Sequence, residues 1–251
     1  MSSVDVRPSL RISPGIRRLG IVLGLPLVDG VFVMLVLAGV LDTLPGIILV
    51  GTVIFAGGGA IAVILTDLAD SPRDYLPGVL LLGAVIVPIA AVQAAIAPVL
   101  ASAVDEQLLS YVATVLLVLV GIQIGSKHFH RRLPSAGLLV LLGILISVRP
   151  NGFSLDGSVD LGLALAGGAA AGIGLGVAIV VLLLGATIHR VIDRDRFRYG
   201  GGIALAVLGV SIVTPISPYV PLVILGFAIL FALDRDKSDV LEESVESATE
   251  Q

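Results

Sequence analysis

Cysteine and tryptophan are absent from this 251-residue sequence, and only 14% of its residues are charged. The absence of cysteine excludes disulfide frameworks, thiolate metal sites and cysteine nucleophiles. The shortage of charge has a wider consequence, because 57% of the residues are hydrophobic and the mean hydropathy is +1.09. A soluble domain of this length needs more charged surface, so we expect the apolar excess to face lipid. The apolar residues are mainly Leu, Val, Ile, Ala and Gly, which is the composition of packed transmembrane helices.

Enzyme signatures are also missing. The sequence has no HExxH metal motif, no GxSxG nucleophile elbow, no P-loop and no GxGxxG loop. His128 and His130 precede Arg131 and Arg132 in a charged turn, where they could contact lipid headgroups or a metal, or simply face water. We therefore expect neither an enzyme nor a cofactor, and the sequence leaves any metal site undefined.

Eight apolar segments are separated by charged or Pro/Gly-rich breaks. A helix needs about 20 residues to cross a hydrocarbon core of about 30 Å, so these segments predict an all-α protein, a polytopic transmembrane helical bundle of about eight spans. Two predictions are weaker, because 135–148 is short and the last two segments, split by Pro215 and Pro218, could form a re-entrant hairpin. The expected spans are 19–41, 44–65, 76–103, 108–126, 135–148, 161–188, 200–214 and 218–233.

The basic residues test this count, because Lys and Arg collect in cytoplasmic loops. With eight spans and the N-terminus inside, fourteen of the fifteen basic residues fall on the cytoplasmic side, and only Arg149 falls outside. Removing one span would move every later basic cluster to the other side. The outer loops carry acids instead, namely Asp42, Asp105, Glu106, Asp156 and Asp160. The pattern predicts a multi-pass protein of the cell membrane with both termini in the cytoplasm.

The charge pattern also divides the chain into three parts. Residues 1–18 are expected to form a cytoplasmic N-terminal segment and 19–233 the transmembrane domain. Residues 234–251 combine acidic residues with Ser and few large apolar groups, which predicts a disordered cytoplasmic tail. The lipid bilayer is the main expected partner, with anionic headgroups contacting basic turns such as 190–198. We expect no nucleic-acid partner.

One acid interrupts the first expected span. Asp29 lies ten residues into it, about 15 Å deep, where an ionised carboxylate is costly and functional more often than elsewhere. Pro26 removes the donor for the Val22 carbonyl, and Asp29 followed by Gly30 could cap a second half-helix. Broken helices of this kind build cation or proton sites in many secondary transporters.

A second interpretation of Asp29 stays open. A protonated Asp29 could join neighbouring helices by a hydrogen bond, for example to Thr52, which lies at a similar depth on the next span. Gln93 is the other intramembrane polar candidate, because it lies between Pro88 and Pro98 in a span with unpaired carbonyls. Gln93 could equally form an ordinary interhelical hydrogen bond.

Glycines recur every four residues in the sixth expected span, at Gly168, Gly172 and Gly176. This spacing places them on one helix face and predicts close approach of another backbone, either within the chain or in a homo-oligomer. The run FAGGGA around Gly57 indicates close packing or a flexible point in the second span.

The stretch VLGLPLVDGVFVMLVLAGVL, residues 22–41, resembles the first helix of TerC-like proteins in the LysE-type exporter superfamily. Those proteins carry an acid implicated in cation handling a few positions after a similar start, and Asp29 would be the matching acid. The chain departs from the pattern at Gly30, where the family usually has Asn, and it lacks a second intramembrane acid in its later half. As a whole it resembles uncharacterised integral membrane proteins of haloarchaea, which implies no established activity. The bias among basic residues, of which only two are Lys, is similar to that of proteins from salt-loving archaea.

Two hypotheses follow from the sequence. The first is a secondary transporter or exporter of a small solute or cation, with Asp29 binding a proton or cation and Thr52 and Gln93 as further candidates. The alternative is a non-transporting membrane scaffold or subunit whose glycines pack against partner helices.

Overall fold

The computed structural model describes residues 13–56, 58–68, 72–126, 136–148, 158–191 and 194–232. Within these ranges the regular elements are helical, apart from an isolated antiparallel bridge between Val104 and Val148. The all-α prediction is confirmed. The elements are α1 (Pro14–Val28), α2 (Val31–Leu37), η1 (Val40–Asp42), α3 (Leu44–Leu49), η2 (Val50–Phe55), α4 (Gly58–Val63), η3 (Ile64–Leu68), α5 (Pro72–Ala101), α6 (Glu106–Gly125), α7 (Ala136–Ser147), α8 (Leu161–Val191), α9 (Arg194–Val213) and α10 (Tyr219–Ala232).

Capping side chains fix the starts of several helices at the hydropathy breaks. The Oγ of Ser13 accepts a hydrogen bond from the Ile16 N–H at 3.3 Å, and the Oδ1 of Asp105 accepts one from the Leu108 N–H at 2.9 Å. Asp160 caps the first turn of α8 in the same way. Each cap satisfies a backbone donor that a first helical turn leaves unpaired. The polar residues between apolar segments therefore set where the helices begin.

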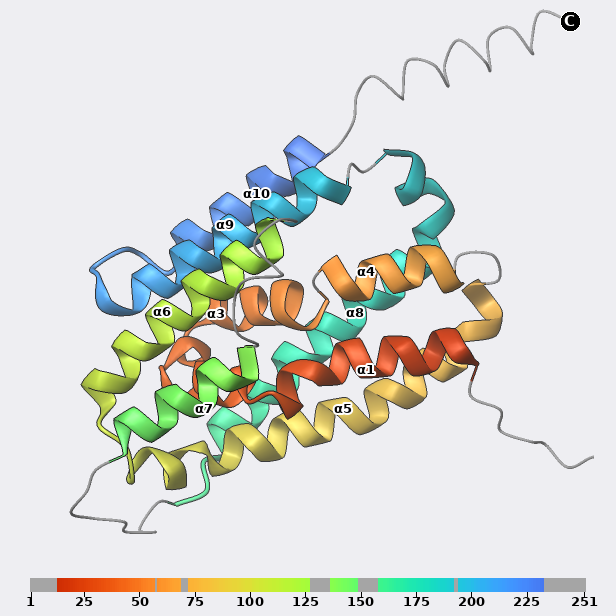
Figure 1. Ribbon diagram of the computed structural model, residues 1–251. Coiled ribbons are helices and arrows are strands. Elements are labelled where there is room, and N and C mark those ends of the chain that lie inside the picture. Colours follow the sequence, from red (N-terminus) through yellow and green to blue (C-terminus); the bar gives the residue numbers. More distant parts are fainter. Residues whose placement is uncertain are drawn as a thin grey trace, which may run out of the picture.

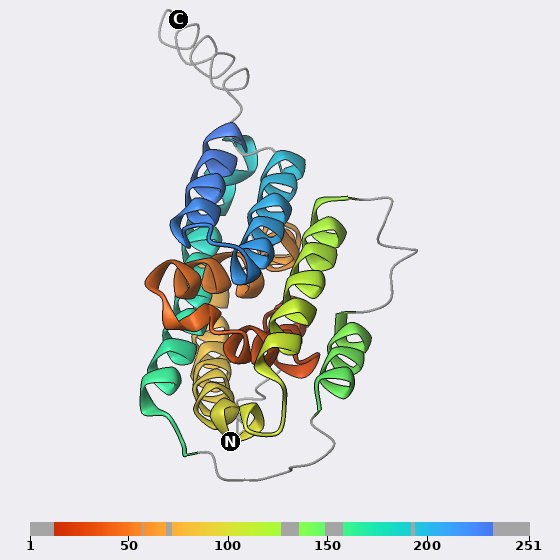
Figure 2. The same ribbon diagram turned by 90° about the vertical axis from the view of Figure 1, so that its left-hand side faces the viewer.

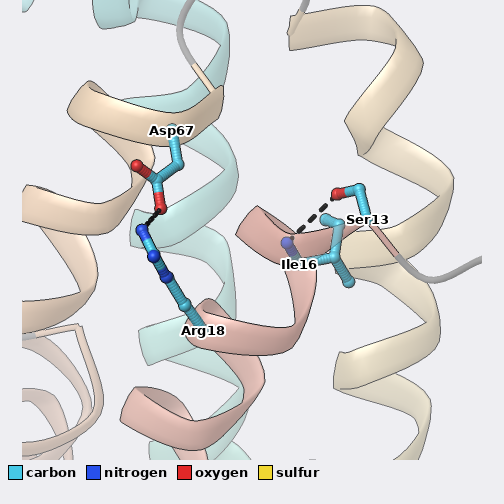
Figure 3. A network of polar contacts seen from close by, with 4 residues as sticks. All are labelled: Ser13, Ile16, Arg18 and Asp67. Carbon is cyan, nitrogen blue, oxygen red and sulfur yellow. Dashed lines mark hydrogen bonds and ion pairs between the residues drawn. The ribbon is translucent and has the colours of Figure 1, made fainter.

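Figure 3 shows the start of α1, where an ion pair joins the first two segments. Arg18 donates to the Oδ2 of Asp67 in η3 at 3.0 Å, close to the Ser13 cap. Exposed pairs of this kind contribute about 0–1 kcal/mol, so this contact sets the register of α1 and η3 more than it stabilises the fold.

The long helices pack in antiparallel pairs, α5 against α8, α6 against α9 and α9 against α10 (Figure 1). The α6–α9 contact is closest at Gly121 and Gly202, where a Cβ added at Gly202 would lie 2.9 Å from the Gly125 nitrogen. Glycine at these positions lets two helix backbones touch, which is how helices associate where lipid removes the usual hydrophobic drive.

The first two apolar segments are both interrupted. Helices α1 and α2 meet at an angle of 40° at Asp29 and Gly30. The second segment runs through α3 and the π-helical η2, stops at Ala56 and resumes with α4 at Gly58. The run FAGGGA, which predicts close packing or a flexible point, includes the interruption at Ala56, and Gly57 itself lies outside the described residues.

These interrupted segments lie among the other helices in Figure 2, with α3 at one edge of the bundle, and α1 keeps an exposed face at Leu25 and Val28. They supply nine of the twelve largest fully buried side chains among the described residues, including Phe32, Leu49 and Phe55. Large apolar side chains on α5, α7 and α10 are exposed instead, as expected for helices that face lipid.

In the part of the chain that the structure describes, four helices are long and apolar enough to cross a membrane, namely α5, α6, α8 and α9, and the bent pair α1–α2 makes a fifth if counted as one span. Helices α7 and α10 and the helix at Leu44–Phe55 are apolar but shorter. Every segment expected from the sequence is thus at least partly helical, while length and composition support four or five spans rather than eight.

Several predictions fall outside the described residues. They concern residues 1–12 of the N-terminal segment, the turn with His128 and His130, and the acidic tail 234–251.

Candidate functional site

The first segment stops being a regular helix at Asp29. Pro26 lies three residues earlier, and Gly30 adopts a left-handed conformation with φ of +81°. The Oδ1 of Asp29 accepts a hydrogen bond from the Val31 N–H at 3.0 Å, so the carboxylate caps α2. In an uninterrupted helix the Val31 N–H would donate to the Leu27 carbonyl. The break therefore takes away the helical donor of Leu27.

Gln93 of α5 supplies the missing donor. Its Nε2 donates to the Leu27 carbonyl at 3.1 Å. The lost backbone hydrogen bond from Val31 to Leu27 is thus replaced by two side-chain bonds. The Asp29 carboxylate accepts from the Val31 N–H, and the Gln93 amide donates to the Leu27 carbonyl. Gln93 lies eight residues before the end of α5, so this polar contact is about 12 Å from that end of the helix along its axis.

One of these two side chains keeps an oxygen without a donor. The Oε1 of Gln93 is buried and has no hydrogen-bond partner. Asp29 is half-buried, and its Oδ1 accepts the hydrogen bond from the Val31 N–H. Carboxylate and amide oxygens at an unwound helix are ligands that suit a proton or a hard cation.

Helix α7 packs over the break. A Cβ added at Gly137 would lie 3.4 Å from the Asp29 Cβ, and one added at Gly30 would lie 3.0 Å from Val140 Cγ1. Gly30 therefore serves both the left-handed turn and the close approach of α7.

The two helix interruptions are neighbours in space. Phe32 follows the first break and Phe55 precedes the second, and their rings meet edge to face with centroids 5.4 Å apart. A Cβ at Gly167 of α8 would lie 3.3 Å from the Phe32 ring, so α8 supports this contact. Two discontinuous helices thus meet where Asp29 and Gln93 lie.

Thr52 does not join this group. Its hydroxyl donates to the Ile48 carbonyl of its own helix at 2.7 Å, a common arrangement for intrahelical Thr. Among the described residues no hydrogen bond links Thr52 to Asp29, so the contact suggested from their similar depth is not formed. Gln93 is the residue that bridges helices at the break.

The glycines expected to face another backbone are only partly used within the chain. A Cβ at Gly168 would make an ordinary contact with Ala91 at 3.5 Å, whereas Gly172 and Gly176 face open space. The close approaches on α8 occur instead at Gly167 and Gly174, which lie on a different face. Contact between Gly172 or Gly176 and a second copy stays a prediction.

The bond from Gln93 to Leu27 could not be predicted from either residue alone. A signal was present, since an acid and an amide occur at interior positions of two apolar segments. What the sequence lacked was the identity of the acceptor, which is a backbone carbonyl released by the break and carries no residue-type signature.

Acidic side chains gather at the end of the bundle where α8 begins. Partial burial raises the pKa of Asp42 above its ordinary range, and the negative charge of Asp160 raises it further. This end of the molecule is thus acidic enough for one carboxylate to oppose ionisation of another.

These features define the class of protein. It is all-helical, it has several apolar helices as membrane proteins do, and its first segment is interrupted at Asp29. The chain belongs to a family of unknown function, DUF5794, which matches residues 86–213. That match includes Gln93 and the glycines of α8 and α9 but not Asp29. No curated protein and no solved structure matches the chain. The resemblance to TerC-like exporters and to haloarchaeal proteins therefore gains no support from these comparisons.

Proposed function

We propose that this chain is a secondary transporter of the cell membrane that moves a small cation, or a solute coupled to a proton, through the break at Asp29. Asp29 binds the cation or proton, and Gln93 holds the broken backbone open and offers its Oε1 as a further ligand. The protein acts without enzymatic chemistry.

One observation carries this proposal. Asp29 and Gln93 together take over the hydrogen bond between Val31 and Leu27, at a point where two interrupted helices meet. Discontinuous helices with a carboxylate and backbone carbonyls at their breaks form the ion sites of many secondary transporters. A bundle that needed only helix packing would have no use for two adjacent interruptions, each of which removes backbone bonds.

Eight crossings with cytoplasmic termini are part of the proposal, and loop contacts support them. The Asp105 N–H donates to the Ser147 carbonyl at 2.8 Å, and the Asp160 N–H donates to the Ala95 carbonyl at 3.1 Å. These bonds gather the ends of α5 and α7 and the start of α8 at one end of the bundle. Consecutive segments therefore alternate in direction, as in an eight-span chain (Figure 1).

Acidic residues lie at both ends of the bundle, with Asp67 and Asp74 near Arg18, but the described arginines lie at the end opposite Asp105 and Asp160. The acidic caps Asp105 and Asp160 lie at the end just described. Arginines at the opposite end include Arg18, whose α1 packs near the start of α5 through Ile16 and Gly78. This distribution is that of a multi-pass protein whose basic end faces the cytoplasm.

The test is charge movement by the purified protein in proteoliposomes on a solid-supported membrane. Jumps in Na⁺, K⁺ or pH are expected to give a transient current with wild type. Asp29→Asn is expected to abolish it, because Asn removes the charge yet can still cap Val31 through its side-chain oxygen.

Asp105→Asn is the matched control, since it makes the same change at another helix cap outside the spans. It should leave the current unchanged. Absence of any current with wild type, or an equal current with Asp29→Asn, would rule the proposal out.

A second function is favoured by a different observation. Among the described residues nothing lies within 4 Å of a Cβ added at Gly172 or Gly176 of α8, as expected for a scaffold or subunit that packs this face against another helix. In that case Asp29 and Gln93 only repair the broken helix. The same experiment would then give no current, and bulky residues at Gly172 would disrupt assembly.

A further inference from the structure

Helix α7 covers the break at Asp29 and runs from there to one end of the bundle. A Cβ added at Gly137 would lie 3.4 Å from the Asp29 Cβ and 3.5 Å from the Asp29 backbone oxygen. The other end of α7 is attached to the start of α6, because the Ser147 carbonyl accepts a hydrogen bond from the Asp105 N–H at 2.8 Å. The 12 residues of α7 extend about 18 Å, so this helix lines the stretch between Asp29 and the end of the bundle that carries the acidic caps.

The face that α7 turns toward the bundle is made of small residues. Gly137, Val140, Gly143 and Ser147 are three or four residues apart and therefore share one helix face. Val140 is the buried hydrophobic side chain of α7, with 3% of its surface exposed. The large side chains of α7 are exposed instead, namely Leu138, Leu141, Leu142, Leu145 and Ile146. Helix α7 thus packs on α2 and α6 without interlocking large side chains.

The pair α5–α8 shows the opposite kind of packing. The Leu175 side chain of α8 occupies the space beside Gly83 of α5, and three turns further along Ala94 of α5 touches Gly167 of α8. Separating these two helices would withdraw a leucine from its socket. Moving α7 would withdraw only Val140, and lipid could cover the exposed surface because apolar side chains are as well solvated by lipid as by protein. Figure 2 shows α7 at the edge of the bundle, where such a movement displaces no other helix.

We propose that α7 is the gate of the Asp29 site. The end with Gly137 and Val140 moves away from the break and exposes Asp29, while the end with Ser147 stays attached to α6. The gate rests on the proposed transport function, since a gate has a role only where an ion enters and leaves. Transport at a fixed site requires the path to open and close, commonly by movement of one part of a bundle against the rest. Helix α7 lies against Asp29 in the structure, which is the closed position.

Introduced cysteines can fix α7 in this position, because the natural chain has none. Val112→Cys with Gly143→Cys joins α6 to α7, since a Cβ added at Gly143 would lie 3.6 Å from the Val112 Cβ, close to the distance of about 3.8 Å found in disulfides. Gly143 lies one turn from Ser147, so the disulfide and the bond to Asp105 hold α7 at two points and fix its direction. The transient current is measured before and after oxidation. The oxidised pair is expected to lose the current, and a reductant should restore it.

Ala91→Cys with Gly168→Cys is the matched control. A Cβ added at Gly168 would lie 3.5 Å from the Ala91 Cβ, so the same kind of bond forms between α5 and α8. Oxidation of this pair should leave the current unchanged, because α5 and α8 stay together when the gate opens. Intact mass measures how completely each disulfide forms.

A second measurement does not depend on a current. Spin labels at Leu138→Cys and Val92→Cys report the separation between α7 and α5 by double electron–electron resonance, and both positions are exposed, so the labels leave the packing intact. Two separations are expected in lipid nanodiscs, and their proportions should change when Na⁺, K⁺ or pH is changed. Labels at Val92→Cys and Val180→Cys, on α5 and α8, should give one separation throughout.

Two results would overturn the gate while transport stands. One is a full current from the completely oxidised α6–α7 pair. The other is a single, unchanging separation between α7 and α5 in every condition. Absence of any current with wild type is a different result, because it refutes transport itself and with it the role of α7 as a gate.

Discussion

At the scale of single residues, Asp29 and Gln93 hydrogen-bond the backbone at the break in the first segment, and they are also the ion-binding residues that we propose. One oxygen of Asp29 and the amide nitrogen of Gln93 repair the backbone, while the Gln93 Oε1 stays buried without a donor. An unpaired buried oxygen costs free energy, and a cation bound as we propose would supply the missing partner.

Gln93→Leu tests whether the hydrogen bond from Gln93 to the Leu27 carbonyl stabilises the fold. Leucine keeps the size of the side chain but leaves the Leu27 carbonyl without its donor, so the free energy of unfolding is expected to fall by about 1–3 kcal/mol. Unfolding in detergent micelles measures this change. Gln107→Leu makes the same substitution at an exposed position in the first turn of α6 and should change stability by less than about 0.5 kcal/mol. Equal effects of the two substitutions would show that the bond to Leu27 does not stabilise the fold.

At the scale of helices, small residues decide which faces meet. The sequence pattern at Gly168, Gly172 and Gly176 pointed to one face of α8, whereas the backbone contacts are made at Gly167 and Gly174. Glycines repeated every four residues identify a helix face that another helix can approach closely. The positions of the neighbouring helices decide whether one does.

Gly202→Val measures the cost of separating α6 from α9. A Cβ there would collide with the backbone at Gly121, and backbone cannot move aside as a side chain can. Stability is expected to fall by about 3 kcal/mol or more, at the upper end of overpacking effects. The control is Gly176→Val, which faces open space and should keep its melting temperature within a few degrees. If both variants melted alike, the close α6–α9 contact would be refuted.

At the scale of the whole molecule, the question is how many times the chain crosses the membrane. Among the described residues four helices, or five with the bent pair, are long enough by themselves, so the eight crossings that we propose require the three shorter apolar helices to cross as well. Short helices at the centre or edge of a bundle can still complete a crossing, because loops and interruptions extend them.

Single cysteines give a direct measurement of topology, since the natural chain has none. With eight crossings, an impermeant maleimide added to intact spheroplasts should label Gln107→Cys and Ser217→Cys, and should label Asp74→Cys only after permeabilisation. All three positions are exposed. A re-entrant α7 would move position 217 to the cytoplasmic side, so labelling there distinguishes the two topologies. Labelling of position 74 in intact spheroplasts would reverse the whole orientation.

The sequence by itself determined that this chain is all-helical with several apolar helices, as in a membrane protein, and it placed the helix starts only to within several residues, for example 76 against Pro72 for α5 and 200 against Arg194 for α9. These properties follow from composition and from local signals, namely apolar runs, capping side chains, proline and glycine, which act within a few residues of one another. The sequence also pointed to Asp29 and Gln93 separately. Only the tertiary structure decided that they meet, that Thr52 turns to its own helix, and that Gly172 and Gly176 face outward, because those outcomes depend on contacts between segments far apart in the chain. The physical reason is that every residue has a backbone carbonyl, which is a strong hydrogen-bond acceptor. When a helix break leaves one without its donor, the new donor depends on which side chains pack nearby and not on the type of residue that carries the carbonyl.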